Sequence, residues 1–92
     1  MDMVAAARDT LALAREHDLD DISSDTEELD YPHLVQMLHE MESKPEKFSP
    51  AKMGRWLGWM QAAVVAQSCG AISLEDMKQI NKNNANDAEE KL

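Results

Sequence analysis

The side chains that could do chemistry in this 92-residue chain are one thiol, three imidazoles and a run of carboxylates. Cys69 has no second cysteine with which to form an internal disulfide or a structural zinc motif. Paired with a distant histidine its thiol could act as a nucleophile, but a buried structural thiol is the better fit. His33 and His39 are six residues apart, on nearly opposite sides of a helix, so one helix cannot present both to a metal ion.

The run of carboxylates that begins at Asp18 resembles a calcium-binding loop only superficially. Such a loop has glycine at its sixth position and glutamate at its twelfth, whereas this chain has Ser23 and Leu29 there. Gly54 and Gly58 fall inside a predicted helix and therefore do not form a phosphate-binding loop. The sequence predicts a protein that is not an enzyme and that uses no cofactor and no metal ion.

The charge of the chain is unevenly distributed. The net charge of −9 comes from 18 acids and 9 bases, but residues 1–43 hold twelve acids and two arginines, a net of −10, and residues 44–92 hold six acids and seven bases, a net of +1. A surface that binds nucleic acid is basic, because it replaces the counterions of the phosphates. The acidic half therefore argues against direct DNA or RNA binding and favours a partner protein with a basic surface, including one that itself binds nucleic acid.

Much of this negative charge lies in residues 18–30, which hold seven acids and no base. Self-repulsion in such a segment predicts a mobile loop. The loop either keeps a small protein soluble or forms an acidic patch that docks on a basic groove in the manner of nucleic-acid phosphates. In the second interpretation the partner-binding residues are Asp18, Asp20, Asp21, Asp25, Glu27, Glu28 and Asp30.

The hydrophobic pattern predicts an all-α protein, a small bundle of three to four helices. The expected helices span residues 3–16, 31–43, 50–68 and about 74–81. Asp2, Asp30, Ser49 and Ser73 stand where residues that cap helix N-termini are favoured, and Gly70 is expected to close the third helix in the left-handed conformation. We expect one domain over residues 1–84, followed by a polar, frayed tail over residues 85–92.

Small residues recur along the third predicted helix. Gly54, Gly58, Ala62 and Ala66 are spaced four apart and form one stripe on its surface. A glycine within a helix costs about 0.5–1 kcal/mol relative to alanine, so two on one face indicate that another backbone comes close there. That backbone belongs either to a helix of the same chain or to a second copy or partner, and both interpretations are open.

The same helix is apolar around most of its circumference. Trp56 and Trp59 lie on different sides of it, and a 92-residue chain has few other helices with which to bury both. This mismatch between apolar surface and available helices favours a homodimer or docking in the groove of a partner. Tryptophan is enriched at binding surfaces, although a tryptophan at helical spacing more often packs in the core. The candidate partner- or self-binding residues of the helix are Gly54, Arg55, Trp56, Gly58, Trp59 and Ala62.

The longest nearly apolar run, residues 56–66, is eleven residues long, whereas a membrane span needs about 20. The N-terminus lacks the basic segment and apolar run of a signal peptide. We therefore expect a cytoplasmic protein with no membrane partner.

Residues 49–82 also carry a recognisable pattern: a proline at 50, Arg-Trp-Leu-Gly at 55–58, an aromatic at 59, Gln61 and a glycine at the turn. This pattern resembles that of small proteins encoded by tailed phages and prophages, usually of unassigned function. The resemblance implies a phage accessory protein that acts inside a bacterial host, and it implies no catalytic residues. By analogy, such a protein binds and inhibits a host nucleic-acid enzyme or defence complex. The alternative is an oligomeric structural or regulatory subunit that assembles through the small-residue face of the helix from Pro50 to Ser68.

Overall fold

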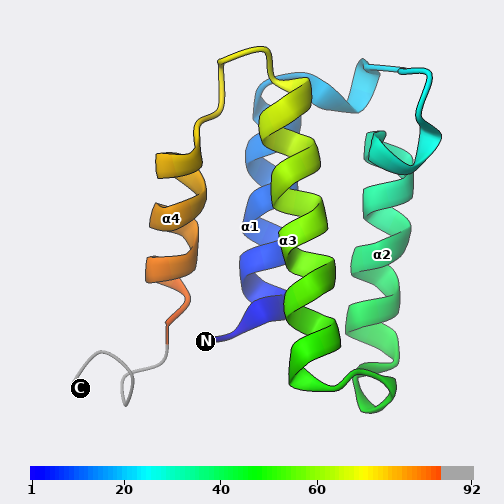
Figure 1. Ribbon diagram of the computed structural model, residues 1–92, viewed down its shortest axis with the longest axis vertical. Helices are drawn as coiled ribbons and strands as arrows, with labels where there is room; N and C mark the ends of the chain where they lie inside the picture. Colours follow the sequence, from blue (N-terminus) through cyan, green and yellow to red (C-terminus); the bar gives the residue numbers. More distant parts are fainter. Residues whose placement is uncertain (86–92) are drawn as a thin grey trace.

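The computed structural model describes residues 1–85, and these form an all-α bundle with no strand (Figure 1). The α-helices are α1 (Met3–Glu16), α2 (Tyr31–Ser43), α3 (Pro50–Gln67) and α4 (Leu74–Asn83). Three one-turn 3-10 helices lie between them: η1 (Leu19–Asp21), η2 (Glu27–Leu29) and η3 (Pro45–Lys47). The predicted fold class is confirmed, while all but the first residue of the predicted tail lies outside the described residues.

Three of the helices begin where their capping residues predict. A side-chain oxygen of Asp2 accepts a hydrogen bond from a backbone N–H of the first turn of α1 at 3.0 Å, and Ser49 does the same for α3 at 3.1 Å. Ser73 and Asp76 exchange hydrogen bonds with each other's backbone N–H at the start of α4, which is a capping box. Each such cap stabilises its helix by about 1 kcal/mol.

Helix α1 is the element on which the others pack. It contacts α2, α3 and α4, and in Figure 1 it lies behind α3 with α2 on one side and α4 on the other. Its buried face is made of small residues, Ala6, Ala7 and Ala14 together with Leu11. Thr10 is also fully buried, and its hydroxyl donates to the carbonyl of Ala6 at 2.8 Å, so no polar group is left unpaired there.

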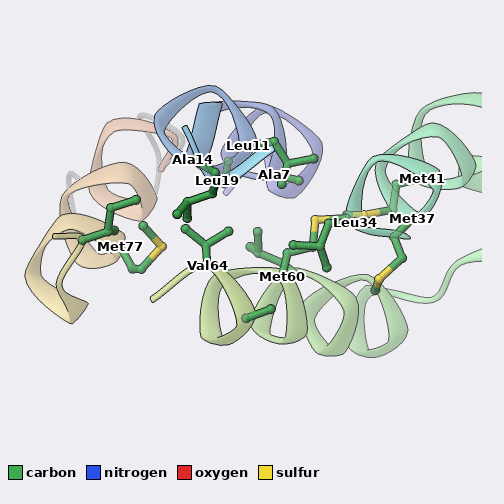
Figure 2. Packing of buried hydrophobic residues seen from close by; sticks show 14 residues of the cluster. Ala7, Leu11, Ala14, Leu19, Leu34, Met37, Met41, Met60, Val64 and Met77 are labelled. Atoms are coloured by element: carbon green, nitrogen blue, oxygen red, sulfur yellow. The ribbon is translucent and has the colours of Figure 1, made fainter. Parts of the chain in front are cut away.

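The remaining core comes mostly from larger side chains of the other elements. Figure 2 shows residues of all four α-helices converging in the space between them. The buried apolar residues outside α1 are Leu19, Leu34, Met37, Met41, Leu57, Met60, Ala63, Val64, Ile72 and Met77. The end of α4 is tied to the start of the chain, because Asn84 accepts from the Asp2 N–H at 2.8 Å and donates to the Asp9 carboxylate at 2.9 Å.

The stripe of small residues on α3 faces solvent. Gly54, Gly58, Ala62 and Ala66 are all exposed. A methyl group at Gly58 would meet no atom within 4 Å, and one at Gly54 would meet only the sulfur of Met3 at 3.8 Å, an ordinary contact. The interpretation that the stripe packs against another helix of this chain is therefore wrong. The larger side chains on the opposite side of α3 determine which face is buried.

The turn after α3 differs from the prediction in one position. Ser68 caps the helix, and Cys69 (φ 52°) and Gly70 (φ 91°) both adopt left-handed conformations, so Cys69 rather than Gly70 stands first after the cap. The Cys69 thiol is exposed, which corrects the expectation of a buried thiol. The buried Ser68 hydroxyl holds the turn instead, since it accepts from the backbone N–H of Ile72 at 3.0 Å.

Two glycine substitutions test this description. We expect Gly58→Ala to raise the free energy of unfolding by about 0.5–1 kcal/mol, because the fold gives that glycine no role. We expect Gly70→Ala to lower it by about 1–2 kcal/mol, because the positive φ disfavours a Cβ. Urea denaturation of both variants measures the two changes. A loss of stability in Gly58→Ala would mean that another backbone approaches this face in solution.

Candidate functional site

The acidic segment between α1 and α2 is anchored rather than free. Asp18 turns the chain in the left-handed conformation (φ 60°), and η1 and η2 follow. Leu19 is buried in the core, with only 4% of its surface exposed. The segment therefore has two short 3-10 turns where a simple loop was predicted. Leu19 is the apolar residue whose burial holds the first turn against the bundle.

Asp30 is the one acid of this segment that is buried, with 8% of its surface exposed. Its carboxylate accepts from the Ser24 hydroxyl at 2.6 Å, from the Ser24 N–H at 3.1 Å and from the Gln67 amide at 3.0 Å. These bonds, those of Ser24 first, hold the pKa of Asp30 below its ordinary value. Its side chain makes no capping bond to α2. Asp30 thus has a structural role, but it also lines the acidic hollow described below, so its assignment to the partner-binding surface stays a prediction.

The other six acids of the segment are exposed, and none of them forms an ion pair with another residue of the described range 1–85. They are Asp18, Asp20, Asp21, Asp25, Glu27 and Glu28. Ion pairs within residues 1–85 join Arg8 to Glu42, Lys44 to Glu40 and Lys78 to Glu75, and none of these involves the segment. Asp20, Asp21, Asp25 and Glu27 line a hollow of about 630 Å³. The charge of this surface is therefore uncompensated by the part of the chain that the structure describes.

A second hollowed surface runs between α2 and α3, and we call it the α2–α3 groove. It consists of two adjoining hollows of about 460 and 640 Å³ that share His33, Met37 and Trp56. Trp59 lines the larger of them and has 46% of its surface exposed, which is unusual for so large an apolar side chain. Such a concave, aromatic-lined surface has the composition of a binding site.

The two tryptophans are held in place by contacts at their edges. The Trp59 indole N–H donates to the backbone carbonyl of Glu28 at 3.1 Å, which fixes η2 beside α3. Trp56 packs edge-on against Phe48, with ring centroids 4.8 Å apart and an interplanar angle of 89°. The Lys52 ammonium lies 5.5 Å from the Trp56 ring centre and 4.8 Å from that of Phe48, within range of cation–π attraction.

The acidic hollow and the α2–α3 groove meet at His33, which lines all three hollows. The structure thus brings together most of the two sets of residues proposed from the sequence: the exposed acids, and Arg55, Trp56 and Trp59 of α3. Gly54, Gly58 and Ala62 line neither surface.

Sequence reasoning missed three members of this site. The sequence pattern assigns no binding role to His33, Met37 or Ser24. The position of His33, one turn before Met37 on α2, could have indicated that it lies beside the groove.

The chain matches no protein-family model, no curated protein and no solved structure at a significant level. Within residues 1–85, no group of three or more His, Cys, Asp or Glu side chains is placed so that it could hold a metal ion. None of the helices described is long and apolar enough to cross a lipid bilayer.

The buried carboxylate gives a testable pH dependence. Because the folded-state pKa of Asp30 is lowered, its contribution to stability is complete above the ordinary value of 3.8 and is lost as the pH falls below it. We expect the free energy of unfolding of the native protein to fall more steeply between about pH 4 and pH 2 than that of Asp30→Asn, which cannot ionise. Urea denaturation across this range measures both slopes, and parallel curves would contradict the assignment.

Proposed function

We propose that the protein acts by binding a partner protein with a basic surface, without chemistry of its own. The observation that carries this proposal is a segment with six exposed acids, none in an ion pair within residues 1–85, whose Glu28 carbonyl accepts a hydrogen bond from the half-exposed Trp59. Clustered charge of one sign attracts an oppositely charged surface and speeds association. A partly exposed tryptophan in a hollow is the kind of residue on which binding free energy concentrates.

The resemblance to phage and prophage proteins supports a more specific partner, a nucleic-acid enzyme or defence complex of a bacterial host. Such enzymes hold their substrate in a basic groove, because they must neutralise phosphates. An acidic surface that occupies this groove competes with the nucleic acid and inhibits the enzyme. This places the proposed action in the bacterial cytoplasm.

A double charge reversal within the acidic hollow tests the proposal. Asp21→Lys with Asp25→Lys changes two exposed side chains that make no hydrogen bond or ion pair of their own in residues 1–85. The matched control, Glu46→Lys with Glu75→Lys, gives the same change in net charge away from the hollow and costs only one exposed ion pair, which is worth little.

The three proteins are immobilised, incubated with bacterial lysate at about 0.1 M and about 0.5 M salt, and their bound proteins identified by mass spectrometry. We expect the native protein and the control to retain one basic nucleic-acid enzyme at the lower salt only, and the hollow variant to lose it. The purified enzyme should then be inhibited by the native protein. The proposal would be contradicted if the variant with Asp21→Lys and Asp25→Lys retained the enzyme. It would also be contradicted if the native protein retained the enzyme equally at both salt concentrations.

A second candidate function is an oligomeric subunit that assembles through the small-residue face of α3. The observation that favours it is the exposure of Gly54, Gly58 and Ala62, since the fold itself has no need of a glycine at position 58. A smooth helix surface allows the backbone of a second copy to approach closely.

This candidate predicts an oligomer that Gly58→Leu disrupts, because the larger side chain would separate the two helices. Ala12→Leu, a change of similar kind at an exposed position of α1, is the control and should leave the mass unchanged. Sedimentation equilibrium measures the masses. If Gly58→Leu keeps the native mass, this face is not the interface.

A further inference from the structure

The α2–α3 groove is an open helix-packing site. Helix α1 contacts both α2 and α3 and so fills one side of the pair, whereas no residue of α1 lines the groove. The side-chain ridges of two neighbouring helices leave grooves into which a further helix can pack. The groove is lined from His33 to Glu40 on α2, a span of about 10 Å or roughly two turns of helix, and from Arg55 to Trp59 on α3.

The lining of the groove indicates what would fill it. Its apolar part comes from Val35, Met37, Trp56 and Trp59, and methionine and tryptophan both adapt well to an inserted aliphatic side chain. Two acids, Glu28 and Glu40, and one base, Arg55, also line it. At His33 the apolar part passes directly into the acidic hollow.

We infer that the α2–α3 groove binds an amphipathic basic helix of the partner protein, an inference that rests on the function proposed above. The apolar side chains of that helix, spaced i, i+3, i+4 and i+7, lie on Met37, Trp56 and Trp59. Its lysines and arginines reach the exposed carboxylates of Asp20, Asp21 and Asp25 in the adjoining hollow.

Charge complementarity selects this occupant over the others. A neutral apolar helix would leave the acids of the hollow unpaired, and an acidic helix or a nucleic acid would be repelled by them. A second copy of this chain, with its net charge of −9, would add to the repulsion. The hydrogen bond from Trp59 to the Glu28 carbonyl already holds the apolar and acidic parts side by side, so binding need not order them.

The probe is a synthetic 14-residue peptide of leucine and lysine, with leucine at the helical spacing given above. A second peptide has serine in place of every leucine and the same charge, and a third has glutamate in place of every lysine. Each is titrated into the full-length protein at low salt while tryptophan emission is recorded. We expect the first to shift the emission to shorter wavelength, the second to bind about tenfold more weakly or worse, and the third not to bind.

Substitutions in the protein locate the site. We expect Trp59→Ala to weaken binding of the leucine–lysine peptide about tenfold, and Trp59→Phe to keep most of it, because phenylalanine retains the apolar surface but not the hydrogen bond to Glu28. Trp56 remains as the reporter in both. Leu74→Ala is the matched control, since Leu74 is an exposed apolar residue on α4 (66% exposed) that lines neither surface, and it should not change the affinity.

These measurements distinguish a failure of the groove as the docking site from a failure of the acidic surface as the partner-binding surface. Equal affinity for the leucine and serine peptides, unaffected by Trp59→Ala but lost in Asp21→Lys with Asp25→Lys, would overturn the groove while leaving the acidic surface in place. Binding of neither basic peptide at millimolar concentration would overturn both. Equal weakening by Trp59→Phe and Trp59→Ala would show that Trp59 acts only by holding η2, and would also overturn the groove as the docking site.

Discussion

The carboxylate of Asp30 joins the acidic segment, the start of α2 and the end of α3. It stands at the start of α2, accepts two kinds of hydrogen bond from Ser24 in the acidic segment and a third from Gln67 at the end of α3. A buried charge of this kind is tolerated only when its lone pairs are satisfied, and here neutral donors satisfy them without an opposing base. These bonds hold the end of the acidic segment against α3 and so help to position its remaining acids.

Residues 18–30 thus divide their charge between two roles. One acid is turned inward and stabilises the fold, while six are turned outward and repel one another. Two further contacts oppose that repulsion, the burial of Leu19 and the hydrogen bond that Trp59 donates to the Glu28 carbonyl. Since Trp59 is both an anchor of the segment and part of the α2–α3 groove, the acidic surface and the apolar surface are mechanically linked.

The sequence alone predicts where the helices begin and end, but it does not predict which of their surfaces are buried or lie side by side. Capping residues such as Ser49 and Ser73 act locally, so the bounds of the helices follow from short stretches of sequence. Whether Gly58 meets another backbone, or Asp30 meets a donor from α3, depends on residues far along the chain, and no local pattern determines it. The acidic and tryptophan-bearing residues were identified separately from the sequence, but their adjacency required the fold.

The central position of α1 has a consequence for how the chain assembles. Helix α1 precedes every partner on which it packs, so during synthesis it emerges before α2, α3 and α4 exist to cover it. A helix in that situation risks aggregation in proportion to the apolar surface it displays. The buried face of α1 is largely alanine, which presents little such surface and still forms helix readily. The alanines that let the later helices approach closely thus also make the nascent helix a poor target for mispairing.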